Sequence, residues 1–122
     1  MTEKNQAAIA AEIAKIAETA LIDKKGMDVT VLSVANQTVL ADYFVIATGS
    51  VNTHVKALAE EVEFKLKQAG HECGHIEGRG DWVLMDYHSV IVHVFTKAAR
   101  EFYKLEKLWD GAEAVAIDAD VE

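Results

Sequence analysis

One apolar run constrains the fold more than any other feature of the sequence. Residues 43–48 read Tyr-Phe-Val-Ile-Ala-Thr, and Gly49 follows them directly. The run contains no charged residue, so a strand formed here has two apolar faces and needs cover on both. A helical pattern follows within a few residues, and its apolar stripe consists of Val55, Leu58, Ala59, Val62 and Leu66. This pairing of a central strand with a packed helix predicts an α/β domain.

The rest of the chain supplies further elements around this strand. Apolar residues from Ile9 to Leu21 recur at three- and four-residue spacing, which predicts an amphipathic helix ending near Lys24-Lys25-Gly26. The remaining predicted elements are strands at 28–34 and 71–76, the two arms of an antiparallel hairpin at 82–85 and 90–95, and a last helix from Lys97. The order predicts a single domain with a mixed sheet of about five strands and flanking helices.

Polar and glycine residues indicate where the helices begin and end. Ser50 or Asn52 is expected to cap the second helix, and Gly70 to end it. Gly26 is expected to adopt the left-handed conformation that closes the first helix. Residues 77–80, Glu-Gly-Arg-Gly, are interpreted as a loop.

Charge and composition exclude several classes of function. The 122 residues include 12 basic and 20 acidic side chains, for a net charge of −8, whereas binding to a phosphate backbone depends on clustered Lys and Arg. No apolar run approaches the roughly 20 residues of a membrane span. The single Cys73 cannot form an intrachain disulfide, and no secretory signal precedes the first helix, so a cytoplasmic location is expected. We expect neither nucleic-acid nor membrane binding, but attraction to a basic protein.

The turn at 47–50 suggests an alternative function, because backbone N–H groups at a helix N-terminus bind anions. The turn lacks the glycine and lysine spacing of known phosphate loops. A nucleotidyltransferase would also need an Asp-x-Asp pair on a strand, and Asp118 and Asp120 lie near the C-terminus instead. A tight turn with a helix cap is the favoured interpretation.

Two other groups have residue types found in metal or catalytic sites. His71, Cys73 and His75 alternate, so one face of a strand would carry all three, and each can ligate zinc. No fourth ligand is evident, and a partly buried strand is favoured. His93 and Asp86 would lie close together in the hairpin, as an acid–base pair does, but no nucleophile accompanies them. We therefore predict no catalytic residue, no metal and no cofactor.

Aromatic residues gather in the final hairpin and helix. A helix from Lys97 would place Phe102, Leu105 and Trp109 on one face, with Arg100 and Tyr103 on another. One of these faces must remain at the surface. Because Trp, Tyr and Arg supply most of the binding energy at protein interfaces, the cluster predicts a protein-binding surface. Packing in the core of a small domain is the alternative.

Four sequence blocks occur along the chain in a fixed order. They read Ala-Asp-Tyr-Phe-Val-Ile-Ala-Thr-Gly-Ser at 41–50, Glu-Gly and Trp-Val-Leu-Met-Asp within 77–86, Val-Ile-Val-His-Val-Phe at 90–95, and Arg-Glu-Phe-Tyr-Lys-Leu-Glu-Lys-Leu-Trp at 100–109. Together they resemble the ribosomal silencing factors, also called Iojap-related proteins. The resemblance supports a domain at 1–110, and the acidic segment 111–122 is predicted to be a tail.

This resemblance implies a fold like a minimal nucleotidyltransferase domain without its catalytic carboxylates. It also implies a translational repressor rather than an enzyme. Such proteins bind the large ribosomal subunit through ribosomal protein L fourteen and sterically block joining of the small subunit. A homodimer is expected when the protein is free. A degenerate nucleotidyltransferase-like protein that binds a nucleotide is the alternative.

The resemblance also implies a docking face on the hairpin and the last helix. Carried over by position, its residues are Trp82, Leu84, Met85, Asp86, Arg100, Tyr103, Leu105, Glu106 and Trp109. Aromatic anchors would supply affinity, and the surrounding acidic charge would speed encounter with a basic ribosomal protein.

Overall fold

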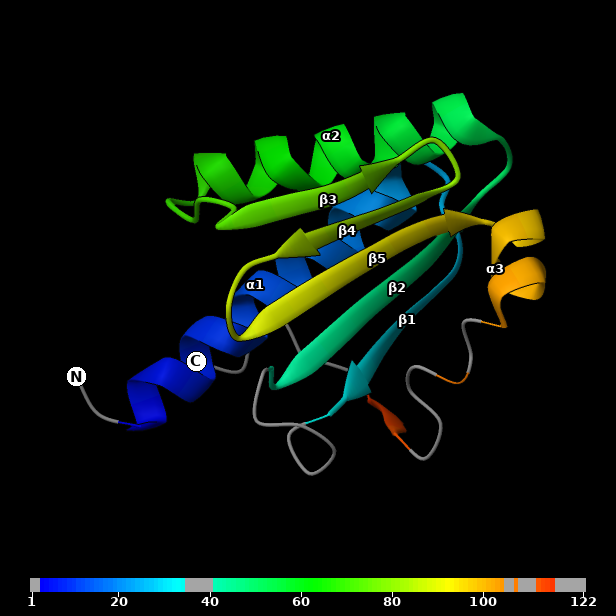
Figure 1. Ribbon diagram of the computed structural model, residues 1–122. Helices are drawn as coiled ribbons and strands as arrows, with labels where there is room; N and C mark the ends of the chain where they lie inside the picture. The colour runs from blue at the N-terminus through cyan, green and yellow to red at the C-terminus, as the bar shows by residue number, and fades with distance from the viewer. Residues whose placement is uncertain (1–2, 35–40, 105–106, 108–111, 116–122) are drawn as a thin grey trace.

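The computed structural model describes residues 3–34, 41–104, 107 and 112–115. Within this part of the chain, three helices accompany one mixed sheet of six strands (Figure 1). The elements in chain order are α1 (Glu3–Asp23), β1 (Met27–Ser33), β2 (Tyr43–Gly49), α2 (Asn52–Gln68), β3 (His75–Arg79), β4 (Trp82–Asp86), β5 (Val90–Thr96), α3 (Lys97–Tyr103) and β6 (Glu113–Val115). The predicted fold class, a single α/β domain with a mixed sheet, is confirmed.

The strands β2 and β5 form the centre of the sheet, whose order is β3-β4-β5-β2-β1-β6. They pair in parallel from Tyr43 opposite Val90 to Gly49 opposite Thr96, and every other pairing in the sheet is antiparallel. All residues of β2 from Val45 to Gly49 are buried. The apolar run is thus the doubly covered central strand that the sequence predicts.

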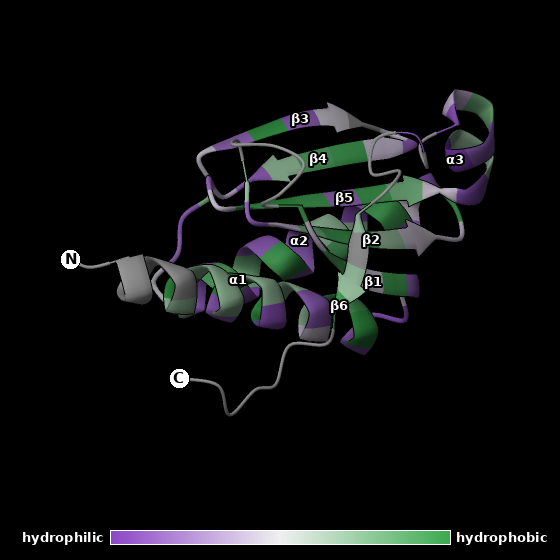
Figure 2. Ribbon diagram, turned by 90° about the horizontal axis from the view of Figure 1, so that it is seen from below, coloured by the Kyte–Doolittle hydropathy of each residue, from purple (hydrophilic) through white to green (hydrophobic). Residues whose placement is uncertain are grey.

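The two faces of the sheet are covered differently. Both long helices, α1 and α2, pack side by side on one face of the sheet. In Figure 1, α1 passes behind the strands and α2 runs along the top of the view above β3, and in Figure 2 α1 lies below the sheet. The larger core cluster lies between them and the strands, and includes Leu21, Leu58, Leu66, Met85 and Val92. A smaller cluster on the opposite face includes Leu32, Ile46 and Phe95. In the described residues, α3 is the only helix on that side, at the end of β5.

The ends of α1 and α2 share one hydrogen-bonding pattern. After α1, the N–H of Gly26 donates to the carbonyl of Leu21 at 2.8 Å, and Lys25 holds the left-handed φ of 65°. The expectation that Gly26 itself is left-handed was wrong. Gly26 is needed for space instead, because a Cβ there would lie 2.9 Å from the Leu21 carbonyl oxygen. After α2, Gly70 follows the helix end as predicted, and it holds a left-handed φ of 91°.

The start of α2 differs from the prediction, because Val51 occupies the cap position and makes no side-chain hydrogen bond. His54 in the first turn folds back instead, and its Nδ1 accepts the backbone N–H of Ser50 at 2.9 Å. The proton on its Nε2 is therefore donated to the Lys24 carbonyl, 2.9 Å away. Through these two hydrogen bonds, the His54 imidazole links the end of α1 to the turn between β2 and α2.

Three element boundaries also differ from the prediction. The strand expected at 71–76 begins at His75 and extends to Arg79, through residues interpreted as a loop. The last helix ends at Tyr103, because Lys104 has a left-handed φ of 53°. Glu113–Val115, in the segment predicted to be a tail, pairs with β1 as a sixth strand. None of the helices described is long and apolar enough to cross a membrane.

Gly70 offers a test of the helix end that involves no side-chain packing. A Cβ at this position would meet no atom within 4 Å, so Gly70→Ala changes only the backbone preference. The left-handed conformation costs an L-residue about 1–2 kcal/mol. We expect Gly70→Ala to lower the free energy of unfolding by that amount in urea denaturation, and the neighbouring Gln68→Ala to change it little. Equal stability of the Gly70→Ala protein would contradict this account.

Candidate protein-binding face

Five aromatic rings form a continuous row across the sheet face opposite α1 and α2. This aromatic row consists of Phe102, Tyr103, Trp82, His93 and Phe44. Neighbouring ring centroids lie 4.9 Å apart for Phe102 and Tyr103, 5.8 Å for Tyr103 and Trp82, 6.3 Å for Trp82 and His93, and 5.0 Å for His93 and Phe44. The row therefore connects α3 to β4, β5 and β2 through ring contacts of the kind that stabilise protein cores and interfaces.

Strand alternation and register bring these rings together. On β4, Trp82, Leu84 and Asp86 are partly exposed, whereas Val83 and Met85 between them are buried toward the helices. Register places Leu84 opposite His93, and Trp82 opposite Phe95. The parallel pairing of β5 with β2 then places His93 opposite Ile46, and Phe44 one step along the same face.

From His93 toward α3, the side chains of the aromatic row become more exposed. His93 is 3% exposed, Tyr103 is 51% exposed and Phe102 is 78% exposed. A side-chain cap fixes α3, because the Thr96 hydroxyl accepts the backbone N–H of Ala99 at 3.1 Å. The exposed end of the row is thus carried on a short helix that begins directly at the central strand β5.

Charged groups surround the aromatic row. Glu77 on β3 lies beside Leu84 in the register, and its carboxylate contacts the His75 imidazole at 2.9 Å. On β4, Asp86 accepts the backbone N–H of His88 at 2.7 Å and so stabilises the turn to β5. The Arg100 guanidinium lies 6.0 Å from the centroid of the Phe95 ring. This side of the sheet therefore combines aromatic surface with carboxylates on β3 and β4.

The nine predicted docking residues fall into three groups according to where they lie in the structure. Trp82, Leu84 and Asp86 share the face of the aromatic row, and Arg100 and Tyr103 approach it from α3. Met85 is fully buried on the other side of β4, so its assignment to the docking surface was wrong. The remaining three, Leu105, Glu106 and Trp109, lie outside the described residues.

Sequence reasoning missed two members of the aromatic row, Phe44 and His93. Alternation along β5 gives His93 the same parity as Phe95, so the hairpin pattern could have placed it on this face. Phe44 depends on the parallel register of β2 and β5, which joins segments far apart in the chain. Of the predicted stripe of Phe102, Leu105 and Trp109, only Phe102 lies within the described residues, and it is exposed rather than packed in the core.

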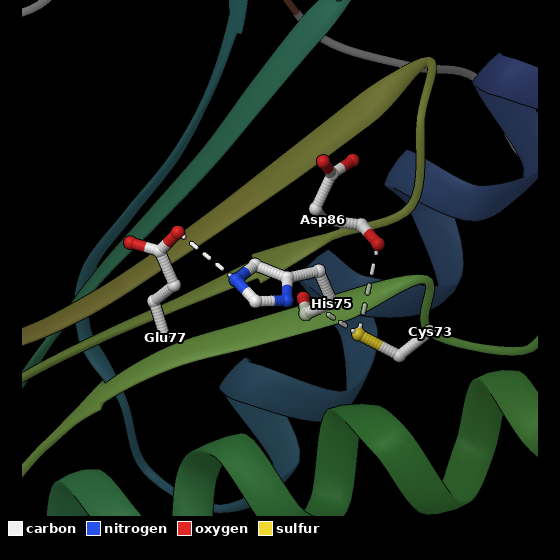
Figure 3. Close-up of polar contacts among 4 residues, drawn as sticks. All are labelled: Cys73, His75, Glu77 and Asp86. Atoms are coloured by element: carbon white, nitrogen blue, oxygen red, sulfur yellow. Dashed lines mark hydrogen bonds and ion pairs between the residues drawn. The ribbon is translucent and has the colours of Figure 1, made fainter.

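The candidate zinc ligands do not converge. Figure 3 shows the Cys73 thiol directed at two backbone carbonyls, those of His75 at 3.2 Å and Asp86 at 3.6 Å. His75 turns to Glu77, and His71 contacts Glu12 of α1. Burial raises the pKa of the Cys73 thiol, which makes it a poor nucleophile at neutral pH. In the described residues, no group of three or more His, Cys, Asp or Glu side chains could hold a metal ion.

The His93–Asp86 pair and the 47–50 turn, both disfavoured as sites from the sequence, make other contacts in the structure. Asp86 lies opposite Ile91 rather than His93, so the acid–base pair does not form across the hairpin. Burial lowers the pKa of His93 to about 4, and its Nδ1 lies 3.5 Å from the indole nitrogen of Trp82. At the 47–50 turn, the N–H of Ser50 is donated to His54 and is not directed at an anion.

The described residues thus form a mixed α/β sheet with a partly exposed aromatic face and carboxylates beside it. A family model described as "Ribosomal silencing factor during starvation", RsfS, matches residues 6–122. The chain therefore belongs to the RsfS family.

Individual relatives agree with this assignment over most of the chain. The ribosomal silencing factor RsfS of Chromobacterium violaceum is 45% identical over 82% of this chain and 84% of its own length. That of Bacillus subtilis is 38% identical over 87% and 92% of the two chains. The crystal structure of protein CV0518 from C. violaceum superposes with a TM-score of 0.79 at 41% identity, and covers 93% of this chain and 98% of the other.

Burial of His93 predicts a pH dependence of stability. Its pKa falls from 6.5 when unfolded to about 4 when folded, so the unfolded chain binds the extra proton between these values. This contribution to stability is present above pH 6.5 and is lost as the pH falls toward 4. Between pH 7 and 4.5 the loss should be about 2 kcal/mol.

The comparison variant is His93→Gln, which keeps a hydrogen-bonding side chain but does not titrate. Urea denaturation at pH 7, 5.5 and 4.5 should show a steeper loss of stability for the parent protein than for His93→Gln. Identical pH dependence of the two proteins would show that His93 is already charged or hydrated in the folded state.

Proposed function

We propose that this protein is a translational repressor that binds the large ribosomal subunit through ribosomal protein L fourteen. The observation that carries the proposal is the aromatic row, whose exposed end on α3 offers two adjacent rings, Phe102 and Tyr103, 4.9 Å apart. Large aromatic side chains at the centre of an interface are typical hot spots. Membership of the RsfS family, whose relatives are named ribosomal silencing factors, supports the ribosome as the target.

Charge supports a protein contact rather than an RNA contact within the subunit. The net charge of −8 repels the phosphate backbone of ribosomal RNA. Carboxylates on the aromatic face, at Glu77 and Asp86, would meet the Lys and Arg side chains of a basic ribosomal protein. In this proposal the aromatic rings supply affinity, while the acidic charge raises the association rate and disfavours binding to bare RNA.

The proposed mechanism is steric and needs no chemical step or cofactor. A protein bound on the intersubunit side of the large subunit would occupy space that the small subunit requires. The free protein would form a homodimer that competes with ribosome binding. The ribosomal partner agrees with the cytoplasmic location expected from the sequence. Nucleotide binding at the 47–50 turn is disfavoured, because the backbone N–H of Ser50 already donates a hydrogen bond to His54.

Substitutions at the aromatic row test the docking face. We expect Trp82→Ala and Tyr103→Ala each to weaken binding to isolated large subunits by about 1–2 kcal/mol, roughly 5–30-fold in Kd. Binding is measured by co-sedimentation with purified large and small subunits, and the small subunit should not retain the protein. Tyr103 is half exposed, so its replacement should leave the fold intact.

The matched control is Ile22→Ala, which removes an apolar side chain that is 56% exposed on α1, away from the aromatic row. It should bind large subunits as the parent protein does. Unchanged affinity of a folded Tyr103→Ala protein would remove this residue from the interface, and binding to neither subunit by the parent protein would end the proposal.

Salt should act mainly on the association rate. If acidic charge directs encounter with a basic partner, raising the salt concentration should slow association while changing dissociation much less. Stopped-flow measurements with labelled protein and large subunits at several salt concentrations separate the two rates. An association rate independent of salt would show that the charge has no role in encounter.

A further inference from the structure

A second apolar surface lies on the helix side of the sheet, away from the aromatic row. It is a groove of about 450 Å³ between α2 and the strands β3 and β4. Ala59 of α2 lines one wall, Ile76 of β3 lines the other, and Val83 and Met85 of β4 form the floor. Ile76 is 43% exposed, so its side chain is accessible to a partner.

The groove exists because α2 does not extend over the edge of the sheet. This helix packs on β2, β4 and β5, and β3 lies beyond them as the edge strand. The middle of β3 also lacks bulk, since Gly78 must be glycine at φ 81°, where a Cβ would lie 2.2 Å from the Trp82 carbonyl oxygen. The groove therefore lies beside a strand edge that pairs with no described strand other than β4, with the exposed Ile76 at its side.

Charge on the rim indicates what could fill the groove. The exposed carboxylates of Glu60 and Glu63 line the α2 side, with Lys56 as the only basic residue among the lining side chains. Glu77 lies on the other face of the same edge strand. A partner would therefore need apolar side chains for the floor and positive charge for the rim and for Glu77.

We propose that this groove binds an extended segment of a partner protein in which apolar residues alternate with Lys or Arg. The segment would add to the edge of β3 by backbone hydrogen bonds, as peptides do when they extend a sheet. Its apolar side chains would enter the groove over Ile76 and Val83. Its basic side chains would emerge on the opposite face, beside Glu77, and at the segment's ends, near Glu60 and Glu63.

A second copy of this chain fits the same edge poorly. Antiparallel pairing of two β3 strands about their centre would place Glu77 directly opposite Glu77, and like charges in such a pair are destabilising. The acidic surroundings of the groove thus favour a basic partner over self-association. The groove itself lies on the opposite face of the sheet from the aromatic row, and Glu77 is the one residue named for both surfaces.

The test uses two short synthetic peptides that carry a fluorophore, one of alternating Lys and Val and one of alternating Glu and Val. Fluorescence anisotropy should show binding of the Lys-Val peptide and at least about tenfold weaker binding of the Glu-Val peptide. Ile76→Lys and Glu63→Lys, both at exposed positions, should each weaken the Lys-Val complex several-fold. The control Ile22→Lys, 56% exposed on α1, should bind normally.

Amide chemical shifts locate the complex. Changes confined to α2 and β3 would support the proposal, whereas changes centred on Trp82 and Tyr103 would overturn it. Equal binding of both peptides, or no loss with Ile76→Lys, would also overturn it, as would a dimer in sedimentation velocity that Ile76→Lys dissociates. No ribosome enters this experiment, so its failure is distinct from failure of large-subunit docking.

Discussion

The parallel pairing of β2 with β5 is the interaction on which the rest of the structure depends. It joins two apolar strands that are separated by α2 and the β3–β4 hairpin arm, and buries both faces of β2. One face receives α1 and α2, which contribute most of the core. The other face receives only α3 among the described helices, so the side chains of β2, β4 and β5 there form a partly exposed aromatic row. The larger core and the candidate docking face thus lie on opposite faces of the sheet that the β2–β5 pairing holds together.

Sequence patterns predicted the elements whose local signal is strong. These are the apolar run of β2, the helical stripe of α2 and the short β-branched and apolar runs of β4 and β5, which are bounded by turn residues. β6 was missed because Glu113–Val115 is short and lies in an acidic segment without alternation. The end of α3 was missed because Lys104 adopts a left-handed conformation that its residue type does not favour.

The sequence could predict residues of the candidate site only where strand alternation alone determines which face a side chain occupies. Trp82, Leu84 and Asp86 have the same parity and share one face, whereas Met85 between them had to face the core. The prediction that all four residues, 82 and 84–86, belong to the docking face neglected this alternation. Phe44 could not be found in this way, since its place beside His93 depends on long-range register. Two surfaces follow from the fold: the aromatic row and the acidic-rimmed groove behind β3.

The most direct test of the central claim is a subunit-joining assay. Large subunits are incubated with excess protein, small subunits are added, and the joined and free particles are separated on a sucrose gradient. The account predicts a large loss of joined ribosomes with the parent protein and recovery of joining with Tyr103→Ala. Undiminished joining while the protein stays bound to the large subunit would contradict steric blocking by this face.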